Sequence, residues 1–226
     1  MTLSKPLQIF WEHSFLSGKV PSHYKTQYII PKYKKGSKNK AEIFRSLVLS
    51  PHEIKIFERV LRDKLVTHVE SNLIINSNQH GFRKSRSCLT QLLSYIHKVL
   101  NHLINHSQVD AIYLDYSKAF DKIDHLMLIQ KLKLYGITEE YLNWIESYLV
   151  GRYQYVYLNG ATSHKAYVKS GVPQGSDLGS LLFILYINDL YSIKAIGGVH
   201  GEIFMLILFY RFFPALSACL YRIKKF

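Results

Sequence analysis

The sequence predicts an α+β fold, and three features of the chain support that prediction. Short apolar runs such as 111–116 have the length and composition of buried strands. Other stretches place apolar residues three and four positions apart, which is the spacing of an amphipathic helix. The dipeptide Asn159-Gly160 between the strand-like runs 153–158 and 166–169 is a strong β-hairpin signal. Because strands alternate with paired helices, we expect a mixed domain with a helical, basic N-terminal part.

The bulk composition indicates an ordered protein with an anionic partner. The 226 residues suffice for one large domain or two small ones, and 48% of them are hydrophobic, which argues against a disordered chain. Lys and Arg outnumber Asp and Glu by 29 to 16, which gives a formal net charge of +13. An excess of this size points to nucleic acid more often than to a generic basic protein.

Cysteine usage and the start of the chain indicate the compartment. Cys88 and Cys219 form neither a metal-binding spacing nor a disulfide framework. Residues 1–10 lack the basic and apolar regions of a secretory signal. We therefore expect an intracellular protein, nuclear or cytoplasmic, in a reducing environment.

The first part of the chain is expected to become helical after an irregular start. Residues 1–50 read as irregular and basic, apart from a short strand at 28–30 that Pro31 ends. Apolar residues at helical spacing predict an amphipathic helix over 54–69. A polar, turn-rich stretch follows, and the leucine-rich face of 89–104 predicts the clearest helix of the chain.

Capping residues mark the helices of the second half. Asp124 is suited to cap a helix that Gly136 ends, and Thr138 is suited to cap the next one. After the hairpin and a glycine-rich stretch, a buried helix is expected over 181–190.

The end of the chain is unusually apolar. Residues 203–221 form a run long enough to cross a bilayer, but Arg211 and Pro214 interrupt it. We therefore favour a buried or misfolded tail, and a membrane span through 203–221 is the alternative.

Two short motifs carry the chemistry. Asp115 ends an apolar run and is followed by Phe120 and Asp121. Further along, the run 171–179 contains a Pro-Gln-Gly turn. A carboxylate at the end of a strand, paired with a turn whose backbone can approach a substrate, is what a metal-dependent phosphoryl-transfer site requires.

These motifs and three others resemble the reverse transcriptases of non-LTR retrotransposons, most closely those of jockey-like mobile elements. The resemblance runs from about Leu7 to Leu190, and the motifs occur in the family's order. The matching segments are Ile29-Ile30-Pro31-Lys32, Phe44-Arg45-Ser46-Leu47, Asn78-Gln79-His80-Gly81-Phe82-Arg83-Lys84, Asp115 to Asp121 with Asp124-His125, and Gly171 to Leu182 with Ile187-Asn188-Asp189-Leu190.

The resemblance implies a right-hand polymerase fold and RNA-directed DNA polymerase activity on an RNA template, a DNA primer and dNTP, with Mg²⁺ as cofactor. It assigns 1–107 to a basic, helical fingers-like region and 108–190 to a partial palm. The family's third palm motif, an Asp-Asp pair, cannot be found, because Glu202 is the only acidic residue after Leu190. No thumb is recognised either, so we interpret 191–226 as an unrelated apolar tail.

The resemblance also assigns roles around the expected catalytic centre. Asp115 is the expected catalytic residue and Mg²⁺ ligand, with the main-chain carbonyl of Tyr116 on the same ion; an exposed strand-end aspartate is the alternative. Phe120 matches the position that excludes a ribose 2′-hydroxyl, and a core phenylalanine is the alternative. Gln174 and Gly175 are expected to contact the incoming nucleotide, and an ordinary glycine turn before a helix is the alternative.

Basic residues are expected to hold phosphates. The forked guanidinium of Arg45 suits the triphosphate of a nucleotide. Lys32, Arg83, Lys84 and Arg86 are expected to bind nucleic acid through template or primer phosphates. The alternative for a lysine-rich loop is a solvated surface without a ligand.

A single carboxylate should not hold the two metal ions that polymerisation needs. We therefore predict that a polypeptide of these 226 residues does not polymerise DNA on its own. The alternative function is that of a catalytically dead remnant that binds nucleic acid through its basic residues. No feature of the sequence indicates a specific protein partner.

Overall fold

A computed structural model describes residues 3–33, 39, 43–105, 109–112, 118–192 and 220–223. The chain forms two compact units. Unit 1 comprises Met1–Ile74 and Ala119–Ile187, and unit 2 comprises Ile75–Lys118 and Asn188–Phe226. Both units contain helices and strands, so the mixed α+β class is confirmed. The assignment of fingers and palm to 1–107 and 108–190 stays a prediction.

The helices of unit 1 pack against one another, and one of them is largely buried. These helices are α1 (Ser4–Leu16), α2 (His52–Ser71), α4 (His125–Leu134), α5 (Glu139–Leu149) and α6 (Asp177–Tyr186). Helix α6 packs against α2 and α4, and α5 packs against α1 and α4. Residues 181–185 of α6 are all buried, as expected for a helix that is apolar on every side. The glycine-rich turn before α6 therefore rests on the core of unit 1.

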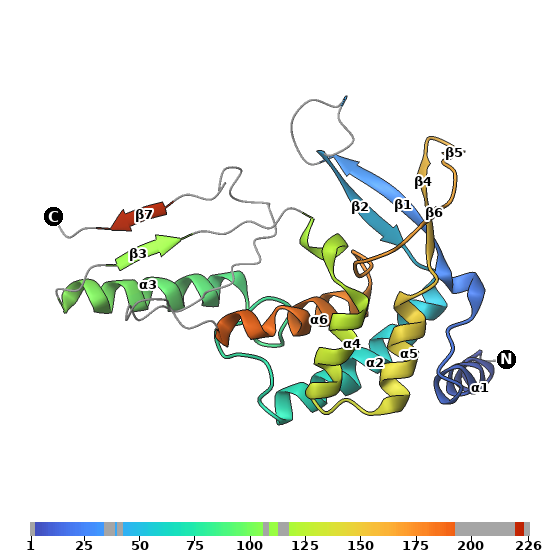
Figure 1. Ribbon diagram of the computed structural model, residues 1–226, viewed down its shortest axis with the longest axis horizontal. Helices are drawn as coiled ribbons and strands as arrows, with labels where there is room; N and C mark the ends of the chain where they lie inside the picture. Colours follow the sequence, from blue (N-terminus) through green and yellow to red (C-terminus); the bar gives the residue numbers. More distant parts are fainter. Residues whose placement is uncertain are drawn as a thin grey trace. The chain divides into compact units, whose positions relative to one another are not determined.

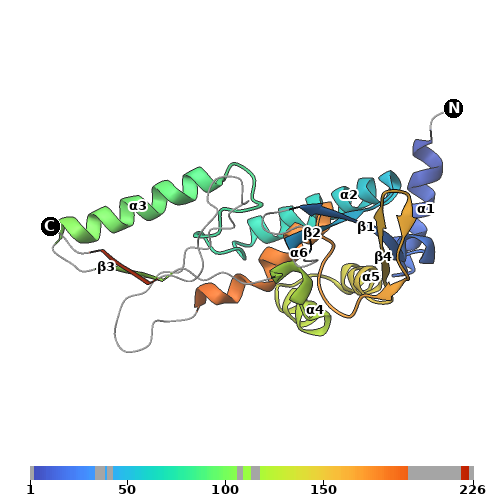
Figure 2. The ribbon, with the colours of Figure 1, turned by 90° about the horizontal axis from the view of Figure 1, so that it is seen from above.

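The sheet of unit 1 combines strands from distant parts of the chain. The strands are β1 (Thr26–Tyr33), β2 (Phe44–Leu49), β4 (Tyr153–Leu158), β5 (Ala161–Thr162) and β6 (Ala166–Tyr167). Strand β1 pairs antiparallel with β2 and parallel with β4, and β5 and β6 both pair with β4. In Figure 1 the sheet lies above the helices α2, α4 and α5, and Figure 2 shows β1 and β4 side by side. Ile29 and Val48 on one face of the sheet are buried.

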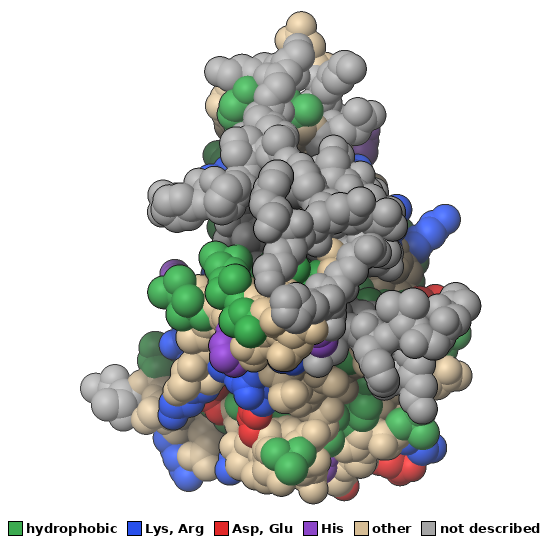
Figure 3. Space-filling model, turned by 90° about the vertical axis from the view of Figure 1, so that its left-hand side faces the viewer, with side chains coloured by type: hydrophobic (Ala, Val, Ile, Leu, Met, Phe, Trp, Pro, Cys, Tyr) green, Lys and Arg blue, Asp and Glu red, His purple; other side chains and the backbone are tan. Residues whose placement is uncertain are grey.

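Unit 2 contains a long helix and a two-stranded sheet. Its elements are α3 (Cys88–Ile104), β3 (Val109–Ile112) and β7 (Leu220–Ile223), with β3 and β7 antiparallel. Ser87 caps α3, because its side chain accepts a hydrogen bond from the Thr90 N–H at 3.2 Å. The apolar face of α3 remains exposed, and Leu89 is 64% accessible to solvent. Figure 3 shows green hydrophobic side chains at the surface among the described residues.

Most of the predicted helices are confirmed. The helices expected over 54–69 and 89–104 form as α2 and α3. Asp124 caps α4, its Oδ1 accepting from the Met127 N–H at 2.8 Å, and Gly136 follows the helix with a φ of +73°. Thr138 stands at the N-cap of α5 as expected, although its side chain makes no capping bond within the described structure.

The expectation of an irregular N-terminal segment is wrong. Residues 1–50 contain helix α1 and the paired strands β1 and β2. Strand β1 also continues through Pro31 to Tyr33 rather than ending at the proline. Its pairing with β4 stops at Ile29, so among the described strands none pairs with Pro31 on that edge, and the missing N–H can face it.

The limits of two later elements also differ from the expectation. The helix expected over 181–190 begins earlier, at Asp177, because Ser176 caps it with a hydrogen bond from the Gly179 N–H at 2.8 Å, and it ends at Tyr186. The strand expected at 111–116 forms as β3 and is described only as far as Ile112.

The apolar run 203–221 falls almost wholly outside the described residues. Its last two residues, 220 and 221, belong to strand β7. Among the helices that the structure describes, none has both the length and the apolar character needed to cross a bilayer.

Candidate nucleotide-binding site

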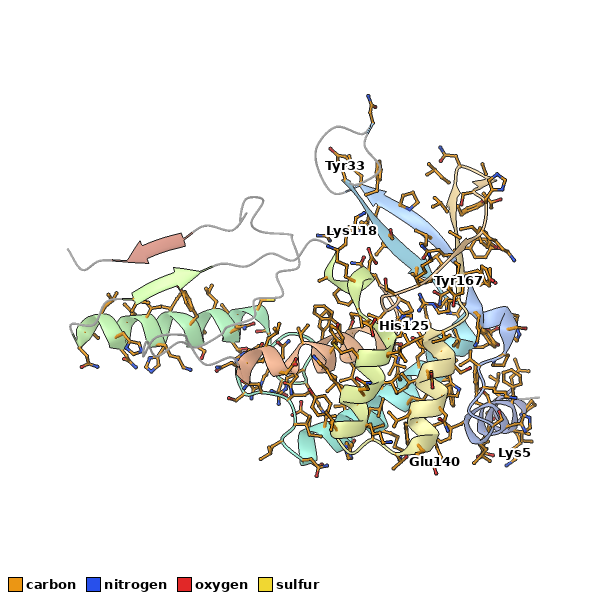
Figure 4. All side chains as sticks on the ribbon, in the orientation of Figure 1. Lys5, Tyr33, Lys118, His125, Glu140 and Tyr167 are labelled. Atoms are coloured by element: carbon orange, nitrogen blue, oxygen red, sulfur yellow. The ribbon has the colours of Figure 1, made fainter. Side chains whose placement is uncertain are left out.

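The Pro-Gln-Gly turn is hydrogen-bonded to the segment that follows the expected catalytic aspartate. The bonds run from Gly171 N to Ile123 O (2.8 Å), from Val172 N to Phe120 O (2.9 Å), from Ser170 Oγ to Asp121 O (2.8 Å), and between His125 Nε2 and Gly171 O (2.8 Å). Figure 4 labels His125 at the start of α4. The two motifs that the sequence singled out therefore meet through their main chains.

Gly171 is required at this contact. Its φ is +89°, and a Cβ placed on it would lie 2.7 Å from Asp121 Cα and 2.7 Å from the Phe120 carbonyl oxygen. No other residue fits so close to a neighbouring backbone without displacing it.

The turn also touches the edge of the sheet. The half-buried Gln174 accepts a hydrogen bond at its carbonyl oxygen from the Val48 N–H of β2, at 3.0 Å. Gly175 is exposed, has a φ of +102°, and would bring a Cβ to 3.5 Å from the Val48 carbonyl oxygen. Strand β2 and the segment at Phe120 thus hold the turn from two sides.

Arg45 and Lys32 are neighbours in the sheet rather than at the turn. The register of β1 and β2 places Lys32 directly opposite Arg45. Side chains alternate along a strand, so Arg45 lies on the face opposite to Val48. The nucleotide-binding role of Arg45 and the nucleic-acid-binding role of Lys32 stay predictions.

Phe120 packs against the core. Its half-buried ring stacks on the ring of Phe183 in α6, with centroids 4.2 Å apart and planes 10° apart. This contact is expected if Phe120 is a core phenylalanine. The same stacking fixes the position of the ring, and a ring that excludes a 2′-hydroxyl must also be fixed in position.

Asp115 and Tyr116 lie outside the described residues, so the structure does not test the expected metal ligands. Within the described ranges, no three His, Cys, Asp or Glu side chains come together to hold a metal ion. The donors expected at this position, a carboxylate and a main-chain carbonyl, are the hard oxygen ligands that Mg²⁺ prefers.

A buried carboxylate that the sequence interpretation missed holds the start of α6. Glu58 of α2 is fully buried; its Oε2 accepts from the Asp177 N–H at 3.0 Å and its Oε1 from the Tyr148 hydroxyl at 2.8 Å. Burial raises the pKa of Glu58, although these hydrogen bonds act in the opposite direction. A sequence signal existed, because Glu58 falls on the apolar face of its helix, four residues after Ile54 and three before Leu61.

Arg152 adds a buried cation to this cluster. It is 3% exposed, and its Nε and Nη1 meet no hydrogen-bond acceptor in the part of the chain that the structure describes. Burial lowers the pKa of Arg152, while nearby Tyr148 and Glu58 raise it. Because a guanidinium stays protonated in proteins, Arg152 is a buried positive charge in the neighbourhood of Tyr148 and Glu58.

In unit 2, two of the expected phosphate ligands organise the turn before α3. Arg83 Nη1 donates to the carbonyl oxygens of Asn76 (3.0 Å) and Gln79 (3.2 Å), and Arg86 Nη1 donates to that of Ser77. Lys84 is exposed to solvent. Arg83 and Arg86 therefore have a structural role beside the expected one.

Comparisons with known proteins agree with the resemblance seen in the motifs. Residues 30–196 match the family described as "Reverse transcriptase (RNA-dependent DNA polymerase)". The chain is 33% identical over 147 residues to the "Probable RNA-directed DNA polymerase from transposon X-element" of Drosophila melanogaster, which covers 65% of this chain and 16% of that protein. It is 30% identical over 174 residues to the "RNA-directed DNA polymerase from mobile element jockey" of the same organism, covering 76% and 19%.

A third relative is less similar. The "Retrovirus-related Pol polyprotein from type-1 retrotransposable element R2" of Popillia japonica is 26% identical over 104 residues, which is 46% of this chain and 17% of that protein. The chain thus spans less than a fifth of the length of these curated relatives. Since the family match covers most of the chain, it belongs to the reverse transcriptase (RNA-dependent DNA polymerase) family, with relatives among the non-LTR retrotransposons.

Proposed function

We propose that the chain is the fingers and partial palm of a reverse transcriptase, and that its nucleotide site forms where the Pro-Gln-Gly turn meets the segment after Asp115. The observation that carries the proposal is the hydrogen-bonded contact of Gly171 and Val172 with Ile123 and Phe120. This contact brings a substrate-approaching turn next to the residues that follow the expected catalytic carboxylate.

The chain's own residues would divide the work of binding a nucleotide. Gln174 and Gly175 would contact the sugar, and the ring of Phe120, fixed by Phe183, would leave no room for a 2′-hydroxyl. Arg45 would grip the triphosphate through its forked guanidinium. These roles select a dNTP over a ribonucleotide by shape rather than by charge.

Asp115 and the Tyr116 carbonyl would hold Mg²⁺, which when bound would neutralise charge on the phosphates of the nucleotide. An Asp-Asp pair in addition to Asp115 is needed for full catalysis, and after Leu190 the sequence contains only Glu202 as an acid. A polypeptide of these 226 residues should therefore bind a nucleotide weakly and should not extend a primer.

Two assays test the proposal. Binding of dUTP and UTP, which differ only at the 2′ position, should favour dUTP in the presence of Mg²⁺. Phe120→Val should reduce that preference, and Phe120→Tyr should retain it as the matched control. Extension of oligo(dT) on poly(rA) should be undetectable. Incorporation that disappears in Asp115→Ala would show that the chain is catalytically complete, and equal binding of dUTP and UTP would remove the assigned role of Phe120.

A catalytically dead remnant that binds nucleic acid is the second candidate. The net charge of +13 and the exposure of Lys32 and Lys84 favour it. RNA binding that weakens with Lys84→Ala, together with no measurable binding of dUTP, would support this candidate over the first.

A further inference from the structure

The end of helix α1 borders a hollow in the surface of unit 1, which we call the α1 hollow. Its volume is about 330 Å³. It is lined by Phe10, His13, Ser14, Ser17, Lys19 and Pro21. The lining residues that come from the helix and its C-cap follow one another three or four positions apart, so they share one side of the helix. The hollow lies before residue 30, where the family match begins, and it shares no residue with the proposed nucleotide site.

The wall of the α1 hollow is fixed by contacts within unit 1, where α1 packs beside α5 (Figure 1). The hydroxyl of the buried Ser14 donates to the Lys19 carbonyl oxygen at 2.7 Å and accepts from Trp144 Nε1 at 3.1 Å. The Lys19 N–H in turn donates to the Ser14 carbonyl oxygen at 3.0 Å. Gly18 between them has a φ of +62°, and a Cβ placed on it would lie 3.0 Å from Asn143 Cβ. Because the wall is already in place, binding a partner there costs little ordering entropy.

Apolar side chains in the hollow and beside it face solvent. Phe10 is 39% exposed, although its ring meets that of Trp11 edge to face with centroids 5.0 Å apart. Ile9 and Leu16, which lie on the adjoining side of the helix, are exposed as well. Helix α1 buries only Trp11 and Ser14, so the core does not use these apolar side chains. Exposed apolar side chains gathered beside a hollow mark an interaction site.

The open shape of the hollow favours one side chain of a larger partner over a free small molecule. His13, Ser17 and Lys19 are exposed, so the lining surrounds a guest only in part. Sites for free small molecules enclose most of the surface of the ligand. At protein interfaces, by contrast, a single aromatic side chain set in a pocket often carries much of the binding energy.

The charge around the hollow selects the chemistry of that partner. Lys19 provides an ammonium group and His13 an imidazole, and none of the lining residues is acidic. Glu12, the only acidic residue of α1, follows Phe10 by two positions and therefore points to another side of the helix. Its Oε1 accepts a hydrogen bond from Gln8 Nε2 at 2.9 Å. Carboxylates next to an aromatic anchor complement such a lining.

We propose that the α1 hollow binds an acidic peptide segment of a protein partner. One aromatic side chain of that segment packs against the Phe10 ring inside the hollow. Carboxylates on either side of it accept hydrogen bonds from the Lys19 ammonium group and the His13 imidazole. The inference goes beyond the proposed function, because it adds a partner at a surface that nucleotide binding does not use.

The test uses the full chain and a fluorescein-labelled peptide, Gly-Glu-Glu-Trp-Glu-Glu-Gly, as the probe. Two comparison peptides replace its tryptophan by alanine or all of its glutamates by lysine. Anisotropy is measured at about 0.15 M NaCl, which screens the general attraction of a basic protein for acidic peptides. The tryptophan peptide should bind about tenfold more tightly than either comparison peptide.

Substitutions in the chain give a second, independent test. Ser17→Trp fills the hollow and should weaken binding about tenfold, whereas Ser71→Trp at the exposed end of α2 is the matched control and should stay within about twofold. Lys19→Glu should weaken binding about 2- to 5-fold more than Lys64→Glu, which makes the same change of net charge at an exposed position of α2. Photocrosslinking with benzoylphenylalanine in place of the tryptophan needs no variant of the chain. Crosslinks within 9–21 support the proposal, and crosslinks found only elsewhere contradict it.

Equal binding of the tryptophan and alanine peptides, or no binding of either, would overturn the proposal, as would unchanged affinity of the Ser17→Trp variant. Light scattering identifies the competing occupant. If Ser17→Trp converts a dimer into a monomer while the wild type does not bind the probe, a second copy of the chain fills the hollow and the proposal fails. The proposal also fails separately from the proposed function. A chain that binds the probe without preferring dUTP to UTP loses only the nucleotide site, and the reverse result removes only the partner at the α1 hollow.

Discussion

The main-chain N–H of Val48 donates a 3.0 Å hydrogen bond to the carbonyl oxygen of Gln174. Val48 belongs to strand β2 and Gln174 to the Pro-Gln-Gly turn, so this bond joins the edge of the sheet to the turn. At its other end the turn is held by two main-chain hydrogen bonds, from the Gly171 N–H to the Ile123 carbonyl oxygen and from the Val172 N–H to the Phe120 carbonyl oxygen. The shape of the candidate site therefore depends on backbone contacts, which suggests substitutions that act through the backbone.

Gly171→Ala is expected to destabilise unit 1 by about 2–5 kcal/mol, because it combines left-handed strain with a clash against neighbouring backbone. Gly160→Ala is the matched control, since Gly160 has a similar φ of +81° and nothing within 4 Å of its Cβ position. It should lose only about 1–2 kcal/mol. Urea denaturation of both variants measures the difference, and equal losses would contradict the close approach at Gly171.

Glu58→Gln is expected to change how stability depends on pH. Because burial raises the pKa of Glu58, the folded state favours the protonated carboxyl. The stabilisation that comes from this shift is fully present below the ordinary glutamate pKa of about 4.3, and it is lost as the pH rises through the raised pKa of Glu58. The glutamine side chain cannot ionise, and its oxygen can still accept the hydrogen bond from the Asp177 N–H. As the pH rises through this range, the free energy of unfolding of Glu58→Gln should therefore increase relative to that of the wild type.

Urea denaturation at a series of pH values from about 4 upwards provides the measurement. Glu146→Gln removes a carboxylate from an exposed position of α5 and controls for the loss of one charge. A constant difference between Glu58→Gln and the wild type at every pH would show that burial does not perturb this carboxyl.

Asp124→Ala should cost about 1 kcal/mol, because it removes the side chain that caps α4 through the Met127 N–H. Thr138→Ala at the corresponding position of α5 should change stability by less than about 0.5 kcal/mol, because the described structure shows no capping bond there. Thermal or urea unfolding of the two variants compares them directly. A larger loss for Thr138→Ala would reverse the assignment of the two caps.

Lys84→Ala and Arg83→Ala separate nucleic-acid binding from folding. Lys84 is exposed, so its removal should leave the fold intact and lower the slope of log affinity against log salt by about 1. Arg83→Ala removes hydrogen bonds to the carbonyls of Asn76 and Gln79 and should destabilise their turn by about 1–3 kcal/mol. RNA titrations at several salt concentrations and amide exchange of residues 76–87 test both results. An unchanged salt slope for Lys84→Ala would exclude a phosphate contact.

Local patterns allowed the sequence to predict most of the helices and the hairpin turn. Asp124 and Gly136 stand at the ends of α4 as expected. The Asn159-Gly160 turn forms as expected but joins β4 to β5, and the second strand expected over 166–169 is the shorter β6. Helix α1 escaped prediction because it buries only Trp11 and Ser14 and so shows little amphipathic pattern.

Contacts between distant segments could not be read from the chain in this way. The parallel pairing of β1 with β4 and the capping of α6 by Glu58 both depend on the tertiary fold. For the candidate site, the motifs named the Pro-Gln-Gly turn correctly as a turn, but its attachment to Val48 appears only in the structure. The roles assigned to Asp115, Arg45 and the other site residues stay predictions.

The parallel register of Thr26 with Tyr153 has a consequence for biosynthesis. Ribosomes add about 5–20 residues per second, so β1 leaves the exit tunnel several seconds before its partner β4 exists. During that interval β1 can pair with β2 but not with β4, and its uncovered edge is open to pairing with other polypeptides. Chaperone demand during translation should therefore fall once the codons for β4 have been read.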